Sequence, residues 1–287
     1  MLSRVDDTYG GHPRICLPGW LVRVKKQLLD LLLPLQSKIV GGKDAVKGQY
    51  PHNVFIKTIN HQERKVRVCG GTLISDRHVL TAAHCIYEVD YLVMVFGSIY
   101  PAFTSGVAIQ FAFQRDFVIH PNFVPRNLKN DIAIIKLSRP LPLTGRVNTI
   151  RLPRLGKSSP LFYEGKEAIV TGWGVTSDDD NKMAGVLQQA KVSIMRQYAG
   201  RTWFGFFGYE LMNSQLCSQY SKHFTGTCFG DSGGPLIMRE RDGRWTLVGV
   251  TSFGDKKCTG DVPSVYTNVS IFLPWIRKEA GIKLRRR

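Results

Sequence analysis

Three short stretches of the chain carry side chains that could act together on a carbonyl group. In TAAHC, His84 brings an imidazole whose ordinary pKa lies near neutrality, so it can take up a proton and return it. In NDIAIIKL, Asp131 stands at the start of an apolar strand, where an acid needs a partner. In TCFGDSGGP, Ser232 follows Asp231 among glycines. A serine hydroxyl is a good nucleophile only when a base removes its proton, so the set predicts acyl-transfer chemistry.

Each residue also has an ordinary structural interpretation. An isolated histidine most often does structural or surface work, and Asp131 could cap a turn or a strand. The glycines favour chemistry, because glycine adopts conformations closed to other residues and lets a substrate approach closely. A tight turn here would aim the N–H groups of Gly230 and Ser232 at one point, where they could bind an oxyanion.

The elements that must position these residues are mostly strands. Alternating apolar stretches separated by turn residues predict strands, and apolar spacing with an early proline predicts a terminal helix over 272–282. Many strands without intervening helices indicate an all-β chain of antiparallel barrels or a sandwich. The predicted strands cover 53–59, 70–75, 91–98, 133–137, 167–174, 234–238, 246–254 and 265–269.

The amino-acid composition and net charge limit the classes of molecule that this chain could bind. The chain has 287 residues and a formal net charge of +17, but its basic residues are scattered apart from the tail KLRRR. A basic protein attracts acidic partners, yet no nucleic-acid motif is visible. We expect a soluble protein with a basic surface, no nucleic-acid partner and a monomeric state.

The six cysteines, at positions 16, 69, 85, 217, 228 and 258, form no CxxC pair. We therefore expect no metal and no cofactor, and instead disulfides formed in an oxidising compartment. The apolar run LLDLLLPL at 28–35 is too short to span a bilayer and lies too far in for a tidy signal peptide. Residues 1–38 show no clear periodicity, so secretion is predicted from the cysteines and motifs alone.

Taken together, the motifs resemble those of the chymotrypsin-like (trypsin-fold, S1) serine peptidase family. IVGG, TAAHC, NDIAIIKL, TGWG, GDSGGP and SFG follow one another in the family's order, and the resemblance covers about residues 39–282. It implies two antiparallel six-stranded Greek-key β-barrels with a C-terminal α-helix. Barrel 1 would span about 39–150, barrel 2 about 151–270 and the helix about 271–282, after an N-terminal or pro-segment at 1–38.

The resemblance also assigns roles, which come from the family and not from the spacing. His84 would be the general base and acid, Asp131 would orient it and Ser232 would be the nucleophile. Gly230 and Ser232 would form the oxyanion hole. Ser252 would hydrogen-bond near Asp131, and the backbone of Ser252, Phe253 and Gly254 would pair with an extended substrate.

Family likeness further implies activation by cleavage. Cutting the Lys38–Ile39 bond would free an α-amino group that pairs with Asp231 and shapes the oxyanion turn. The uncut chain would then be a zymogen. The activating enzyme would be another, trypsin-like peptidase, because the pocket described next does not favour lysine.

The family's primary pocket maps here onto Gly226, Gly254 and Ser264. Trypsin-type members carry Asp at the first position, and glycine offers a buried cation no partner. A chymotrypsin-type preference for Phe, Tyr, Leu or Met before the scissile bond (the P1 position) is expected. Asp255 and Asp261 lie nearby in sequence and leave a trypsin-like or collagenolytic alternative open.

The cysteine pairing implied by the resemblance is Cys69–Cys85 and Cys228–Cys258. Cys217 lacks its family partner, so it is free or joined to Cys16, and we favour a free thiol. No acidic loop matches the family's calcium site. Asn268 lies in a glycosylation sequon on a predicted strand.

The sequence thus predicts a secreted, extracellular serine endopeptidase without a membrane span. Its partners would be protein or peptide substrates, the activating peptidase and protein inhibitors of peptidases. The alternative from another class is a catalytically silent homologue that uses its basic surface to bind a partner. Intact His84, Asp131 and Ser232 argue against that alternative.

Overall fold

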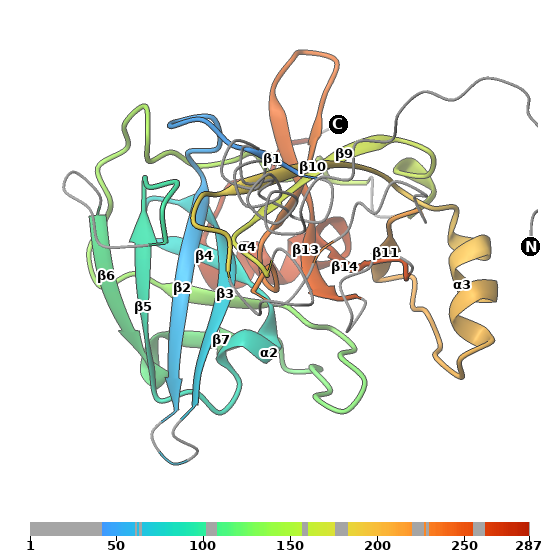
Figure 1. Cartoon of the computed structure of the whole chain (residues 1–287), viewed down its shortest axis with the longest axis horizontal. Helices are drawn as coiled ribbons and strands as arrows, with labels where there is room; N and C mark the ends of the chain where they lie inside the picture. The colour runs from blue at the N-terminus through green and yellow to red at the C-terminus, as the bar shows by residue number, and fades with distance from the viewer. Residues whose placement is uncertain are drawn as a thin grey trace, which may run out of the picture. The chain divides into compact units, whose positions relative to one another are not determined.

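Antiparallel strands dominate the computed structural model (Figure 1). It describes residues 42–60, 62, 65–101, 108–156, 160–175, 183–219, 227, 230–254 and 262–286. All of these belong to one compact unit that spans 37–287. The proposed pro-segment at 1–38 lies outside the described residues.

The first sheet has the order β6-β5-β2-β3-β4-β8-β7. Its two edge strands are neighbours along the chain, because only the 3-10 turn η1 (Gln114–Asp116) separates β6 from β7. The sheet therefore closes into a barrel of six strands, one of them interrupted. The strands are β2 (Asn53–Asn60), β3 (Lys65–Ser75), β4 (His78–Thr81), β5 (Tyr91–Phe96), β6 (Ala108–Phe113), β7 (Phe117–Ile119) and β8 (Ala133–Lys136).

The second sheet has the order β1-β10-β9-β12-β13-β14-β11. A bridge between Ile194 and Ser218 joins the end of β10 to the end of β11, and Met195 N donates to Cys217 O at 2.8 Å. This closes a second six-stranded barrel, with β1 added outside it. The strands are β1 (Lys43–Asp44), β9 (Glu167–Gly172), β10 (Gln188–Ser193), β11 (Gln215–Cys217), β12 (Pro235–Arg239), β13 (Trp245–Phe253) and β14 (Val265–Asn268).

Both barrels follow the same Greek-key order. In the first, β5 returns to lie beside β2, and in the second, β12 lies beside β9. The expected pair of six-stranded antiparallel barrels is confirmed. One detail differs: β1 falls in the segment that the sequence assigned to barrel 1, yet it pairs with β10 of the second sheet. A two-residue strand has too little pattern to show its partner.

Apolar side chains from both barrels form a shared core. Leu73 and Ile134 of the first barrel belong to the same buried cluster as Ile237 and Leu247 of the second. Full burial of such side chains contributes roughly 1.5–3 kcal/mol each. The backbones approach closely at Gly70, where a β-carbon would lie 2.7 Å from Gly234 Cα. A side chain at position 70 would force the barrels apart.

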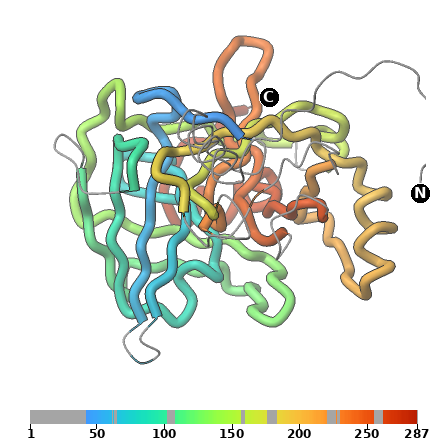
Figure 2. Tube along the Cα trace, viewed as in Figure 1, coloured from blue at the N-terminus to red at the C-terminus, as the bar shows by residue number. Residues whose placement is uncertain are grey.

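Three helices complete the described part of the chain: α2 (Ala83–Ile86), α3 (Gln197–Gly205) and α4 (Leu273–Ala280) (Figure 2). The C-terminal helix α4 begins after the short η3 turn (Val269–Phe272), with Pro274 in its first turn. It ends at Gly281, whose φ of 65° is the left-handed conformation that favours glycine. Within the described residues, no helix has both the length and the apolar character needed to cross a bilayer.

Candidate active site

His84 is delivered by a one-turn helix. Strand β4 ends at Thr81, and the fully buried Ala82 and Ala83 anchor the start of α2 in the first barrel. The imidazole is left partly exposed, with 26% of its side chain accessible. It can therefore meet a substrate while its backbone stays fixed.

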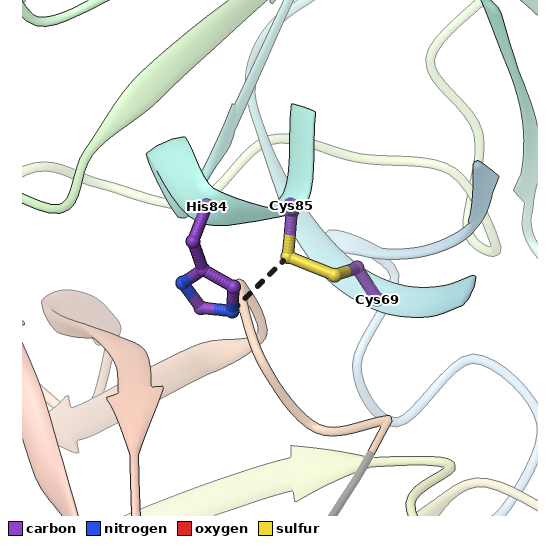
Figure 3. A group of neighbouring side chains, drawn as sticks. All are labelled: Cys69, His84 and Cys85. Atoms are coloured by element: carbon purple, nitrogen blue, oxygen red, sulfur yellow. Dashed lines mark hydrogen bonds between the residues drawn. A yellow bond between two sulfur atoms is a disulfide. The ribbon is translucent and has the colours of Figure 1, made fainter. Parts of the chain in front are cut away.

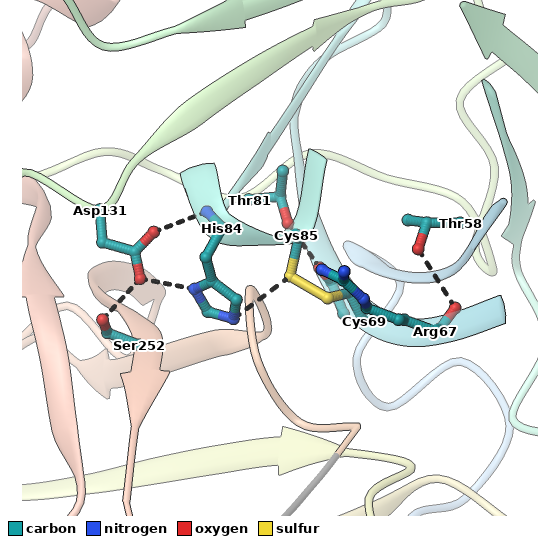
Figure 4. The surroundings of a disulfide bond; sticks show 9 residues. Thr58, Arg67, Cys69, Thr81, His84, Cys85, Asp131 and Ser252 are labelled. Carbon is teal, nitrogen blue, oxygen red and sulfur yellow. Dashed lines mark hydrogen bonds and ion pairs between the residues drawn. A yellow bond between two sulfur atoms is a disulfide. The ribbon is translucent and has the colours of Figure 1, made fainter. Parts of the chain in front are cut away.

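Asp131 hydrogen-bonds to both the backbone and the ring of His84. Its carboxylate is fully buried and accepts three hydrogen bonds: from His84 N at 2.9 Å, from His84 Nδ1 at 2.7 Å and from Ser252 Oγ at 2.6 Å (Figure 4). A buried carboxylate needs such donors to be tolerated. Because the second bond favours the tautomer with hydrogen on Nδ1, the acceptor lone pair lies on Nε2.

Ser232 is held between the two barrels. Its carbonyl accepts from Gly70 N at 2.7 Å, and the next residue, Gly233, donates to Thr251 O at 2.8 Å. Ser232 and His84 line one cavity of about 820 Å³. No hydrogen bond joins the Ser232 hydroxyl to His84 Nε2 in the described structure, where Nε2 instead contacts Cys85 Sγ at 3.8 Å (Figure 3). In unliganded enzymes, this kind of catalytic hydrogen bond is often long and tightens with substrate.

The glycines beside Ser232 meet two physical requirements. Gly230 has φ +96° and Gly233 has φ +79°, both in the region that favours glycine. A β-carbon on Gly233 would also lie 2.2 Å from Thr81 Oγ1 and 2.5 Å from Gly70 O. The turn that presents Ser232 can therefore exist only with glycine at position 233.

Asp231, which precedes Ser232 in this turn, is fully buried. Its Oδ1 accepts from Gly174 N at 2.8 Å. A β-carbon on Gly172 would lie 2.0 Å from Oδ1, and one on Gly174 would lie 2.5 Å from Oδ2. The two glycines of TGWG thus make room for this carboxylate. Its expected partner, Ile39, and Lys38 lie outside the described residues.

Two of the three expected pocket positions lie in contact. A β-carbon on Gly254 would be 3.3 Å from Ser264 Oγ, which accepts from Thr227 N at 3.2 Å. Gly254 and Thr227 also line the cavity of Ser232. The third position, Gly226, lies outside the described residues, as do Asp255 and Asp261.

A disulfide joins Cys69 of β3 to Cys85 of α2, with 6.2 Å between the Cα atoms. It fixes the helix that carries His84 to the first barrel. The two sulfurs lie close enough to His84 to suggest a metal site, but the disulfide leaves them no thiolate to offer a metal (Figure 3).

Cys217 is a buried free thiol, as favoured from the sequence, and burial raises its pKa. Cys16 and the expected Cys228–Cys258 pair lie outside the described residues.

Sequence reasoning missed two neighbours of the site. Thr267 Oγ1 donates to Asp131 O at 2.7 Å, and Tyr209 lines the cavity while its ring lies 5.2 Å from that of Phe253. Neither stands in a motif. Both reach the site through tertiary packing, so no local signal could have pointed to them.

Comparison with known proteins agrees with this architecture. The family model described as Trypsin matches residues 39–276. The chain is 32% identical to ovochymase of Halocynthia roretzi over 86% of its length, and 30% identical to transmembrane protease serine 11C of Mus musculus over 85%. A solved structure described as HL collagenase superposes with a TM-score of 0.73 at 27% identity, covering 86% of this chain and all of that one. The chain belongs to the trypsin family of serine peptidases.

The match covers only part of the curated relatives. It spans 15% of ovochymase and 54% of transmembrane protease serine 11C.

Proposed function

We propose that this chain is a serine endopeptidase that hydrolyses peptide bonds through an acyl-enzyme. Asp131 orients His84, His84 Nε2 takes the proton of the Ser232 hydroxyl, and Ser232 attacks the carbonyl. His84 then returns the proton to the leaving amine. In the second half of the reaction His84 takes a proton from a water molecule that attacks the acyl-enzyme, and it returns this proton to Ser232 as the acid product leaves. The N–H groups of Gly230 and Ser232 stabilise the oxyanion. The observation that carries the proposal is the hydrogen bond between buried Asp131 and partly exposed His84, whose ring opens on the cavity that Ser232 lines.

The proposed substrate preference is a large apolar P1 residue. The small Gly254 beside Ser264 supports it, because no charge at either position would pair with a buried lysine or arginine. A panel of peptides that differ only at P1 tests this preference. Faster cleavage after Phe and Leu than after Arg and Lys is expected, and the reverse order would contradict it.

Activation is proposed to follow cleavage of Lys38–Ile39 by a trypsin-like peptidase outside the cell. The buried carboxylate of Asp231 supports a role as the acceptor of the new amine. Breaking a buried ion pair by removing one partner typically costs about 3–5 kcal/mol, so a pair between Asp231 and the new amine would be strong enough to hold the oxyanion turn in shape.

The test compares the chain that starts at Ile39 with the full chain on one peptide ester. The Ile39 form should be faster by about 10² or more, since about 1.4 kcal/mol corresponds to a factor of ten. Equal rates would contradict the activation switch. Ser232→Ala serves as the control for hydrolysis that does not come from this site.

Collagen cleavage is a second candidate, because the superposed solved structure is described as a collagenase. Incubation of the Ile39 form with native triple-helical collagen tests it directly. Discrete large fragments would support the activity, and intact collagen beside a cleaved peptide control would exclude it.

A further inference from the structure

The turn after α3 holds two phenylalanines in solvent. Phe206 is 83% exposed and Phe207 is 72% exposed. The turn is hydrogen-bonded: Phe207 N and Tyr209 N both donate to Phe204 O at 3.0 Å. An ordered turn that keeps two large apolar rings in water forgoes the gain from burying them. Such patches commonly mark interaction surfaces.

A row of aromatic rings connects this turn to the active-site cavity. Phe253 and Tyr209, which line that cavity, have ring centroids 5.2 Å apart. The row continues from Tyr209 to Phe204 at 5.7 Å, to Trp203 at 4.8 Å and to Phe207 at 4.7 Å. Phe204 in this row is buried, so the ring contacts fix the exposed turn close to the site through the interior.

Tyr209 also borders a second hollow. A cavity of about 840 Å³ beside α3 is lined by Tyr209, Gly205, Gly208 and Leu211. The tyrosine is fixed in place, since its hydroxyl donates to Asn127 O at 3.2 Å and accepts from Gln215 Nε2 at 2.8 Å. The hollow thus adjoins the active-site cavity at Tyr209, and Gly205 and Gly208, which flank the two exposed phenylalanines along the chain, also line it.

We propose that Trp203, Phe206, Phe207 and Tyr209, which we call the aromatic ridge, bind apolar residues of an extended polypeptide substrate. These residues lie N-terminal to the scissile bond. The inference rests on the proposed function and on the pairing of an extended substrate with Ser252–Gly254 that the family resemblance implies. Tyr209 lines both the active-site cavity and the hollow beside α3, and this continuity favours substrate as the occupant over a second copy of the chain.

The length of an extended substrate chain fits the distance from Phe253 to the far end of the aromatic ridge. The four ring-to-ring steps bound the path from Phe253 to Phe207 at about 20 Å. An extended chain covers about 3.3 Å per residue, so about six residues beyond Phe253 suffice. Short peptide substrates would never touch the far end of the ridge, whereas protein substrates would.

The test uses two long peptides with identical residues around the cleavage point. One carries Phe and Leu about six to eight residues before the cut, and the other carries Ser there. The Ile39-started chain should cleave the apolar peptide about tenfold better in kcat/KM, with the gain in KM, because the ridge binds ground and transition states equally. Phe206→Ser/Phe207→Ser should bring the ratio to about one and leave a four-residue substrate unaffected.

Two control variants distinguish loss of the aromatic ridge from general damage to the protein. Phe111→Ser removes a phenylalanine that is 52% exposed on β6 of the other barrel and should keep the tenfold ratio. Phe206→Leu/Phe207→Leu should retain most of it. A wild-type ratio near one would overturn the proposal, as would a ratio unchanged in the serine double variant.

Two further outcomes are distinguishable. If the double variant loses only self-association in sedimentation velocity while the peptide ratio stays, the occupant is a second copy and the proposal is wrong. If the wild-type chain cleaves no peptide at all, the proposed function itself fails and the ridge proposal fails with it.

Discussion

At the scale of single residues, the Ser252 hydroxyl gives Asp131 a third hydrogen-bond donor beside the two from His84. It donates at 2.6 Å to the same Oδ2 atom that holds His84 Nδ1. Removing it leaves a buried carboxylate with one donor fewer and a less constrained imidazole. We expect Ser252→Ala to lower kcat by about tenfold with little change in KM, since the hydroxyl acts through His84. Steady-state kinetics on a short ester checks this, and an unchanged kcat would remove Ser252 from the positioning role.

His52 gives a pH prediction. It is buried against Tyr50, its Nε2 has no hydrogen-bond partner in the described structure, and burial lowers its pKa to about 3. The unfolded chain binds a proton at this residue near pH 6.5, and the folded chain does not until about pH 3. The titration of His52 therefore takes nothing from the free energy of unfolding above about pH 6.5. Below that value the free energy of unfolding falls as the pH falls towards 3.

The measurement is guanidinium unfolding between pH 7 and 4. His52 should make the free energy of unfolding fall by up to about 1.4 kcal/mol per pH unit. His52→Phe keeps a ring against Tyr50 but cannot titrate, so its curve should be flatter. Parallel curves for the two proteins would contradict the assignment.

At the scale of elements, α3 packs on β11 without a covalent tie. A β-carbon on Gly200 of α3 would lie 3.4 Å from Cys217 Sγ and 3.0 Å from Leu211 Cδ2. Gly200→Cys should therefore form a disulfide with Cys217 and raise the free energy of unfolding by about 1–3 kcal/mol, less if Leu211 cannot shift. Denaturation with and without reductant measures it, and Gly200→Ser is the matched control. Two free thiols in the folded variant would show that the helix lies elsewhere.

Sequence reasoning reached some elements and not others for a physical reason. His84, Asp131 and Ser232 stand in motifs whose local backbone needs are visible in the residues themselves. Strand β10 and helix α3 are not visible in this way, because β10 begins with two adjacent glutamines and has only Ala190 and Val192 as apolar residues, and α3 contains glycine and β-branched threonine. Their conformation is set by the neighbours they pack against, and so is the position of Tyr209.

At the scale of the whole molecule, Arg285 of the basic C-terminal tail is bound to the second barrel and to the connection between the barrels. Arg285 donates to Leu152 O in the connection between the barrels and to Glu240 after β12, at 2.6–3.1 Å. The hydrogen bond from Arg285 lowers the pKa of Glu240. Charge counts along the sequence cannot show this, because the partners are more than forty residues away.

We expect Arg285→Ala to lower the free energy of unfolding by about 2 kcal/mol, since it breaks several charge-assisted hydrogen bonds. Glu240→Gln should cost about 1 kcal/mol, and the double variant should cost less than the sum because the two residues share one interaction. Chemical denaturation of the four proteins measures this. Strict additivity would mean that Arg285 and Glu240 do not interact in solution.

The central claim is that His84, held by Asp131, activates Ser232. Treating the Ile39-started chain with diisopropyl fluorophosphate and mapping the adduct by mass spectrometry tests it most directly. One phosphoryl group is expected, on Ser232, and the rate of labelling should fall by orders of magnitude in His84→Ala although Ser232 is still present. Absence of the adduct, or equally fast labelling without His84, would show that His84 does not activate Ser232.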